Sequence, residues 1–261
     1  MSIKPFKLAL IQMQVEGGEK IRNLNHAVEL IAEAAANGAQ VALLPECLDL
    51  GWTHPSSLTE AEPVSIGFPC TTLINAAIEN KIYVCAGLTE KADDKIFNSA
   101  VIIDKNGIIK CLHRKINELE IGYEFYSQGD RLNIAESEFG TFGLMICADA
   151  RAPDFVLSKA LGQMGADIIL SPCAWAVPHD HDNSKTPYRK EWLDAYSPVA
   201  KKFSVWIAGV SNVGLITGGP WKNYNCIGCS LVVGPAGNKI AQGPYGVDAE
   251  TILYVDVSSL S

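Results

Sequence analysis

The first 46 residues contain a strand, a helix and a second strand in succession, and this pattern limits the possible folds more than any other feature. Residues 6–13 form an apolar run of strand length, and residues 41–44 form another. Between them, apolar residues recur at spacings of 3, 4, 3 and 4, which places them on one face of a helix; they are Ile21, Leu24, Val28, Ile31 and Ala35. A connection of this length is typical of two parallel strands joined through a helix, so we expect an α/β layered domain.

The alternation of strands and helices continues to the end of the chain. Asn106-Gly107 is a hairpin signal between predicted strands at residues 99–104 and 108–112. Other strands are predicted at residues 83–88, 142–146, 167–170, 204–210, 230–233, 239–242 and 252–255, and helices at residues 72–80, 155–164 and 187–202. No stretch has the composition of a linker, so we predict one domain over residues 1–261.

The composition excludes several functional classes. Apolar residues make up 48% and charged residues 19% of the 261 positions, which is typical of a globular protein with a sizeable core. The net charge is -8, and the longest basic runs, Lys201-Lys202 and His113-Arg114-Lys115, are short. Binding to nucleic acid or to an anionic membrane requires many clustered cations, so we expect neither partner.

Two further observations favour the reducing cytoplasm as the compartment. The amino-terminal apolar run is about eight residues long and contains Gln12, so we expect neither a signal peptide nor a membrane span. The eight cysteines are scattered singly through a chain large enough to fold without disulfides.

Two segments carry residue types that bind metals, and neither predicts a site. Cys226 and Cys229 form a single pair with no second pair to complete a zinc site. Residues 179–182, His-Asp-His-Asp, lie in a proline-flanked polar segment that is typical of a solvated loop. We therefore expect no metal and no cofactor.

The best candidates for chemistry are polar residues that directly follow apolar strands. Glu46 follows the run at residues 41–45, and Cys147 follows the run at residues 142–146. Open α/β sheets place ligand sites at the carboxyl ends of their strands. A carboxylate close to an apolar layer has a raised pKa and is suited to proton transfer. The cysteine is ambiguous on residue type alone, because a thiol also packs well as a small apolar group.

Three separated segments resemble, in order, the motifs of the nitrilase superfamily of carbon-nitrogen hydrolases, and its amidase-like branch in particular. They are Leu44-Pro45-Glu46, His113-Arg114-Lys115 and residues 147–154, Cys-Ala-Asp-Ala-Arg-Ala-Pro-Asp. Residues 167–175, 192–214, 228–230 and 235–237 extend the similarity across nearly the whole chain. The resemblance implies a four-layer α-β-β-α sandwich that pairs through the helices flanking the nucleophile strand into an αββα-αββα homodimer. A higher homo-oligomer is the alternative.

The resemblance also implies a mechanism without a cofactor. Cys147 would attack the carbonyl carbon of an amide, Glu46 would act as the base, and Lys115 with the N–H group of Ala148 would stabilise the oxyanion. Ammonia would leave, and water would release the acid from a thioester. The implied substrate is a small linear carboxamide or an N-carbamoyl compound. Nitrile hydrolysis, transfer of the acyl group to an amine, a catalytically silent binding protein and a cysteine-histidine enzyme are the alternatives.

Many members of the superfamily carry a second glutamate between the lysine and the cysteine. Glu118, Glu120 and Glu124 are the candidates here, and Glu124 is preferred because an aromatic pair and a glycine turn follow it; Glu120 is second. Trp175 and Tyr123 are predicted to be pocket walls, as are Trp52 and Phe125, because sites for small ligands are mostly apolar. Arg151 could bind a substrate carboxylate, but a structural ion pair with the nearby Asp149 or Asp154 is the preferred prediction.

Overall fold

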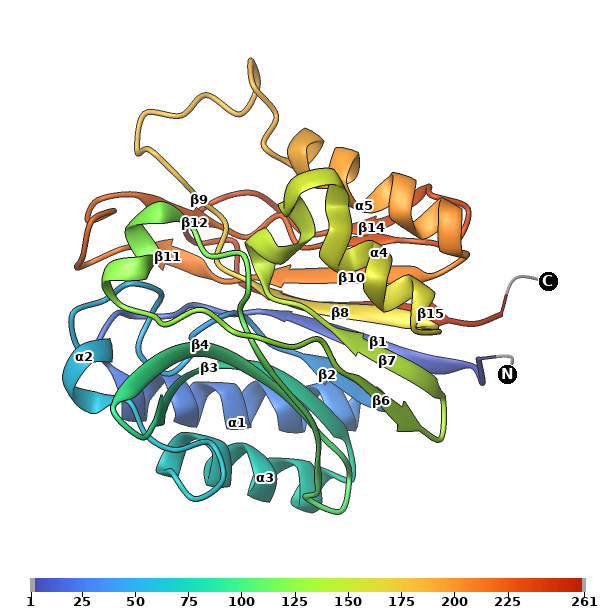
Figure 1. Ribbon diagram of the computed structural model, residues 1–261, viewed down its shortest axis with the longest axis horizontal. Helices are drawn as coiled ribbons and strands as arrows, with labels where there is room; N and C mark the ends of the chain where they lie inside the picture. Colours follow the sequence, from blue (N-terminus) through green and yellow to red (C-terminus); the bar gives the residue numbers. More distant parts are fainter. Residues whose placement is uncertain (1–2, 260–261) are drawn as a thin grey trace.

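Four layers make up the protein, whose computed structural model describes residues 3–259. Two sheets face each other in the middle of the molecule (Figure 1). The outer face of the first sheet is covered by α1 (Lys20–Ala36) and α3 (Phe68–Asn80). The outer face of the second is covered by α4 (Val156–Gln163) and α5 (Arg189–Phe203). The α/β fold with two sheets flanked by helices is therefore confirmed.

The first sheet contains the crossover that the first residues predict. Its β1 and β2 are parallel, with Leu8 opposite Val41, and α1 connects them. The last strand of the chain pairs with β1 in the antiparallel direction. The sheet has the order β15 (Thr251–Val257), β1 (Phe6–Gln12), β2 (Val41–Leu43), β3 (Tyr83–Ala92), β4 (Lys95–Ile103) and β5 (Ile109–Arg114).

The second sheet is also mixed, with β7, β8 and β10 parallel to one another. Its order is β14 (Lys239–Gln242), β13 (Leu231–Val233), β10 (Trp206–Ser211), β8 (Ile168–Cys173), β7 (Gly140–Leu144) and β6 (Ile134–Ser137). A small third sheet contains β11 (Val213–Leu215), β12 (Asn225–Ile227) and β9 (Ala176–Val177). The remaining elements are α2 (Ser57–Glu60) and three short 3-10 helices, Glu120–Glu124, Cys147–Arg151 and Pro153–Phe155.

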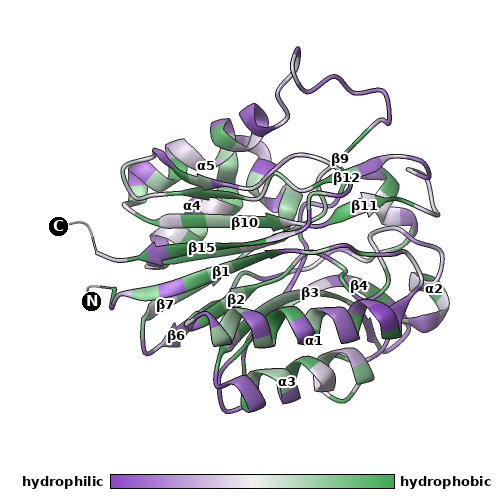
Figure 2. Ribbon diagram, turned by 180° about the vertical axis from the view of Figure 1, so that it is seen from behind, coloured by the Kyte–Doolittle hydropathy of each residue, from purple (hydrophilic) through white to green (hydrophobic). Residues whose placement is uncertain are grey.

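The strands are apolar on both faces because each sheet is covered on both sides. Along β1, Leu8 and Leu10 point into the core between the sheets, whereas Ala9 and Ile11 pack under α1 and α3. Figure 2 shows this contrast as apolar strands beside helices with hydrophilic outer faces.

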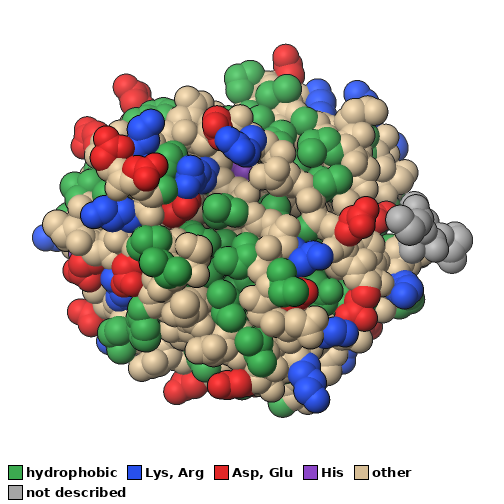
Figure 3. All heavy atoms as spheres, turned by 60° about the horizontal axis from the view of Figure 1, so that its bottom comes forward, with side chains coloured by type: hydrophobic (Ala, Val, Ile, Leu, Met, Phe, Trp, Pro, Cys, Tyr) green, Lys and Arg blue, Asp and Glu red, His purple; other side chains and the backbone are tan. Residues whose placement is uncertain are grey.

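In Figure 3, acidic and basic side chains are interspersed on the face shown. Among residues 3–259, no helix combines the length and apolarity that crossing a membrane requires.

One pair of strands is longer than the sequence indicates. The strand predicted at residues 83–88 continues to Ala92 and forms a second hairpin with β4 through a turn at Asp93. Its last residues are mostly polar, so a search for apolar runs does not identify them as part of the strand. The predicted hairpin at Asn106-Gly107 is confirmed, and Gly107 has the positive φ of 81° that such a turn requires.

Candidate active site

Three of the predicted catalytic residues meet between the two sheets. Glu46 follows β2, Lys115 follows β5, and Cys147 follows β7 and begins a short 3-10 helix. Their exposed fractions are 1%, 3% and 8%. The Nζ atom of Lys115 lies 2.7 Å from Oε1 of Glu46, and all three side chains line one cavity. Residues from separate strand ends thus form one site, as expected for an α/β sheet.

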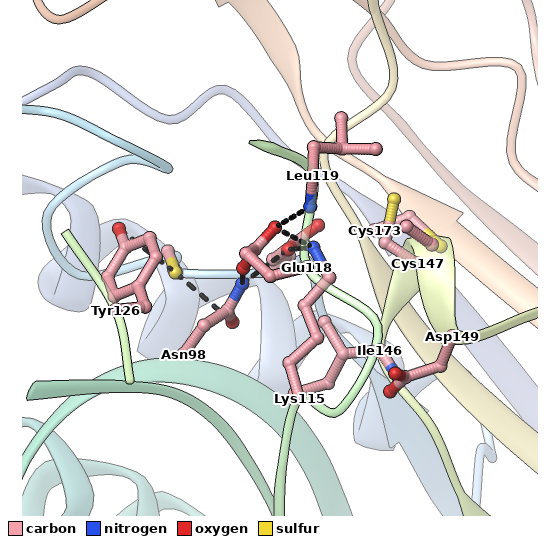
Figure 4. A network of polar contacts seen from close by, with 12 residues as sticks. Asn98, Lys115, Glu118, Leu119, Tyr126, Ile146, Cys147, Asp149 and Cys173 are labelled. Atoms are coloured by element: carbon pink, nitrogen blue, oxygen red, sulfur yellow. Dashed lines mark hydrogen bonds and ion pairs between the residues drawn. The ribbon is translucent and has the colours of Figure 1, made fainter. Parts of the chain in front are cut away.

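The second carboxylate at the lysine is Glu118, not the preferred Glu124. Oε1 of Glu118 lies 2.8 Å from Nζ of Lys115, and the same oxygen accepts a hydrogen bond from the N–H of Leu119 (Figure 4). Glu124 and Glu120 are exposed on the 3-10 helix Glu120–Glu124, away from the lysine. Lys115 therefore lies between two buried carboxylates, Glu46 and Glu118.

Asn98 is a site residue that the sequence analysis missed. It lies on β4, and its Nδ2 donates to Glu46 at 2.6 Å and to Glu118 at 3.0 Å. Its backbone oxygen accepts from the N–H of Lys115 at 2.8 Å. The side-chain amide of this residue thus holds both carboxylates, and its backbone carbonyl holds the backbone of the lysine. A polar residue in a mostly apolar strand is the signal that could have identified it.

The site raises the pKa values of both Glu46 and Lys115, for different reasons. Burial raises the pKa of Glu46 above its usual value, although Lys115 and Asn98 oppose this by stabilising the carboxylate. Burial alone would lower the pKa of Lys115, but the charges of Glu118 and Glu46 outweigh it and raise that pKa well above its usual value. The lysine is therefore cationic, and Glu46 is a carboxylate of enhanced basicity.

The thiol of Cys147 requires a base to become a nucleophile. Burial raises its pKa well above the usual value, contact with Cys173 and the charge of Glu46 raise it further, and Lys115 lowers it. Cys147 and Cys173 lie side by side at the ends of β7 and β8 (Figure 4). At neutral pH the thiol of the free protein is protonated, so a nearby proton acceptor is needed for attack.

Asp149 connects the turn of the nucleophile to the loop of the lysine. The carboxylate is fully buried and accepts from the N–H groups of Ile116, Asn117 and Ile146 at 2.8 to 3.0 Å. Nε2 of His113 donates to the same carboxylate at 2.7 Å. These bonds fix the segments on both sides of Lys115 and the residue before the nucleophile.

The backbone at the nucleophile is held in a special conformation. Cys147 has a φ of 43°, in the left-handed region, and its N–H donates to Oγ of Ser171 at 3.2 Å. The carbonyl of Ala148 accepts from Nδ2 of Asn117 at 2.6 Å. Ala148 is the second residue of its 3-10 helix, so its own N–H has no partner within that helix and is available to a ligand.

The cavity above these groups has a volume of about 260 Å³, and four of its twelve lining residues are aromatic. It is lined by Glu46, Lys115 and Cys147 together with Trp52, Asn117, Leu119, Ala148, Arg151, Ala174, Tyr188, Trp192 and Trp221. The edge of Trp52 meets Trp221, with 5.0 Å between ring centroids. Ala148, the predicted oxyanion donor, and Trp52, a predicted wall residue, thus lie at the cavity.

The other predicted walls lie elsewhere. Trp175 is buried behind the cavity, where it stacks on Trp192 with 4.6 Å between ring centroids. Ala174 faces the cavity in its place. Tyr123 is 50% exposed, and it lines a separate surface depression with Phe125.

Arg151 does not pair with its sequence neighbours. Its Nη1 lies 2.7 Å from Oε2 of Glu191 on α5. Asp149 is unavailable to it because that carboxylate is fully used by buried donors. Arg151 therefore forms an ion pair, but the predicted partners Asp149 and Asp154 are wrong, because the partner is Glu191 on α5.

Within residues 3–259, no three side chains of the types His, Cys, Asp and Glu are grouped so that they could hold a metal ion. Cys226 and Cys229 are both buried at the small third sheet, and His179 lies in an exposed loop.

A buried glutamate, lysine and cysteine at strand ends form the arrangement expected from the sequence motifs. Comparison with known proteins identifies the family. Residues 7–260 match the Carbon-nitrogen hydrolase family. The chain belongs to this family. It is 33% identical to a nitrilase of Pyrococcus abyssi over 177 residues, a match that spans 66% of each chain. It is 29% identical to the omega-amidase NIT2 of Bos taurus over 262 residues, or 97% of this chain and 88% of the relative.

Solved structures share the fold. Nit3 of Saccharomyces cerevisiae superimposes with a TM-score of 0.80 at 24% identity, over 98% of this chain and 90% of that protein. A double mutant of the amidase from Nesterenkonia sp. AN1, in complex with acrylamide, superimposes with a TM-score of 0.80 at 20% identity, over 97% and 90% of the two chains.

Proposed function

We propose that this protein is an amidase that hydrolyses the C–N bond of small carboxamides through a thioester on Cys147. One observation carries the proposal: a lysine held at 2.7 and 2.8 Å by two buried carboxylates lines the same cavity as a buried cysteine. Relatives named omega-amidase and an amidase of the same fold support the choice of an amide as substrate.

In the first half of the reaction, Glu46 takes the proton of the Cys147 thiol and the sulfur attacks the carbonyl carbon. The developing oxyanion is stabilised by the charge of Lys115 and by the N–H group of Ala148. The tetrahedral intermediate then breaks its C–N bond, and Glu46 gives its proton to the departing nitrogen. Ammonia leaves, and the acyl group remains on Cys147 as a thioester.

In the second half, Glu46 takes a proton from water, and the resulting hydroxide attacks the thioester carbonyl. The C–S bond breaks, the sulfur recovers the proton, and the carboxylic acid leaves. Glu118 and Asn98 position Lys115 throughout. Glu118 accepts a hydrogen bond from Lys115 directly, as Glu46 does, and Asn98 donates to Glu118. An N-carbamoyl compound fits the same steps, since it also presents an amide carbonyl with an amine leaving group.

A nitrile is the second candidate substrate, because the same thiol can attack a nitrile carbon and a relative at 33% identity is named nitrilase. A cysteine-histidine mechanism is disfavoured, since no histidine stands among the described residues that line the cavity. His113, the histidine nearest in sequence to Lys115, is buried and bound to Asp149.

The protein is further proposed to form a homodimer through α4 and α5, the helices beside the nucleophile turn. Val156 and Met164, at the two ends of α4, are 53% and 43% exposed. Burial of such side chains would favour pairing. Light scattering of the purified chain distinguishes a dimer from a monomer.

The eight cysteines are all unpaired and buried, which is compatible with the proposed cytoplasmic location.

Ammonia release from a panel of short carboxamides, N-carbamoyl amines and nitriles tests the proposed activity. The wild type is expected to release ammonia from amides, and Cys147→Ala is expected to release none. Equal release by both would contradict the mechanism. Silence of the wild type across the panel would favour a binding role.

A further inference from the structure

We propose that this cavity selects amides whose acyl group is uncharged and apolar, and that Glu191 determines this choice by neutralising Arg151. The inference rests on the amidase activity proposed above and names the class of its substrate. It follows from how each charged side chain that lines the cavity is already paired with a neighbour.

The inner end of the cavity does not attract a second anion. Lys115 and Arg151 are the two cationic side chains among the described residues that line it. Lys115 is already bound to Glu46 and Glu118. With both carboxylates ionised, this group has one excess negative charge in a buried environment, where charges interact strongly. A carboxylate elsewhere on the substrate would be repelled by it.

The outer end of the cavity is electrically neutral for a different reason. Arg151 donates to Glu191 at 2.7 Å, and the guanidinium also lies 6.0 Å from the ring centroid of Trp192. Glu191 and Trp192 are neighbours in the first turn of α5, so both contacts of the guanidinium come from this one helix. The guanidinium has further N–H donors, but Glu191 already neutralises its charge, so a substrate carboxylate at Arg151 would compete with Glu191 for that charge.

The walls between these ends offer apolar contact. Trp52, Trp192, Trp221 and Leu119 are large apolar residues among those that line it. At about 260 Å³ the cavity is small for a ligand site, so a short acyl chain fills it. Each methylene buried there should raise kcat/KM roughly fourfold until the cavity is full, because burial of one methylene contributes ~0.8 kcal/mol.

Two amides of similar length test the selection. Hexanamide has an uncharged chain, and glutaramate, the half-amide of glutaric acid, carries a carboxylate at the far end. The kcat/KM values of the wild type, Glu191→Gln and Asp194→Asn are compared at low ionic strength. Asp194 is the matched control, because it lies on the same helix, pairs with Lys190 at 2.7 Å and is not part of the cavity wall.

The wild type is expected to prefer hexanamide at least tenfold. Glu191→Gln frees the charge of Arg151 and should raise the ratio of glutaramate to hexanamide turnover about fivefold, the size expected of a half-exposed ion pair. Asp194→Asn adds the same net charge and should leave the ratio unchanged.

Turnover of both amides without this preference, or the same ratio in Glu191→Gln as in the wild type, would overturn the inference and leave the amidase activity intact. Equal effects of the two variants would assign the change to net charge and would overturn it as well. Ammonia release from neither amide would contradict the activity. In that case, binding of the two amides to Cys147→Ala, measured by calorimetry, still decides whether the cavity discriminates.

Discussion

Nδ2 of Asn98 lies 2.6 Å from Oε1 of Glu46, the same oxygen that receives the ammonium group of Lys115. The amide and the lysine therefore share one acceptor. Burial raises the pKa of Glu46, and both donors oppose this effect by stabilising the ionised carboxylate. The basicity of the proposed base thus depends on a strand residue that takes no part in the proposed proton transfers.

Replacement of Asn98 by Ala should shift the acid limb of the activity profile. Loss of the hydrogen bond removes an influence that lowers the pKa of Glu46, so the acid limb of kcat/KM should move to higher pH. The maximum of kcat/KM should fall roughly tenfold to a hundredfold, the effect of removing a hydrogen bond to a charged group. The pH profile of amide hydrolysis measures both.

Asn23→Ala is the control for Asn98→Ala. Asn23 is equally buried, and it donates to backbone oxygens of Glu16 and Asp49, away from the cavity. It should lower stability without moving the acid limb. A shift of equal size in both variants would show that the shift is a general consequence of lost packing.

Glu118→Gln and Glu124→Gln separate the two candidates for the second glutamate. Glu118 helps to raise the pKa of Lys115, so its neutralisation should reduce kcat about a hundredfold and move the basic limb to lower pH. Glu124 is exposed, and Glu124→Gln should retain activity within about twofold. Steady-state kinetics across the pH range gives both values. A larger loss of kcat in Glu124→Gln than in Glu118→Gln would identify Glu124 as the second glutamate.

Cys173→Ala should make the nucleophile more acidic. Burial is the main cause of the raised pKa of Cys147, and contact with Cys173 adds to it. Without this contact, the pH midpoint for alkylation of Cys147 by iodoacetamide should fall. Cys70→Ala, a buried cysteine on α3, is the control and should leave the midpoint in place. An unchanged or higher midpoint in Cys173→Ala would rule out the predicted influence.

Asp149→Asn should destabilise the fold at neutral pH. Burial alone would raise the pKa of Asp149, but the hydrogen bond and the charge of His113, together with the backbone donors, lower it below its usual value. A carboxyl with a lowered pKa contributes stability above the pKa of the unfolded chain, and this contribution is lost as pH falls through the folded pKa. The free energy of unfolding should therefore decrease by about 3 kcal/mol at pH 7.

The same comparison in acid tests the sign of this effect. The difference between Asp149→Asn and the wild type should shrink below about pH 4. Asp154→Asn is the control, since Asp154 is exposed; it should change stability by less than about 0.5 kcal/mol. Urea titrations at several pH values give the free energies, and a pH-independent difference would contradict the account.

Local patterns predicted the fold and the strand-end residues. Glu46 and Cys147 could be identified because apolar runs show where strands end, and the ends of such strands meet. Lys115 was identified from its motif. The layers follow from the periodicity, since the covered sheets require strands that are apolar on both faces.

The missed residues depend on the path of the chain in space. Glu118 reaches Lys115 because the loop after β5 turns back, and residue types around Glu124 contain no information on that turn. Trp175 points into the core because Ala174 faces the cavity. Arg151 pairs with Glu191 on α5, 40 positions along the chain.

Intact-protein mass spectrometry during turnover tests the central claim most directly. Wild-type protein mixed with hexanamide and quenched in acid should gain the mass of one hexanoyl group, and peptide mapping should place that group on Cys147. Cys147→Ala should gain none. Ammonia release without an acylated wild-type species under any quench time, or acylation at another residue, would contradict thioester catalysis by Cys147.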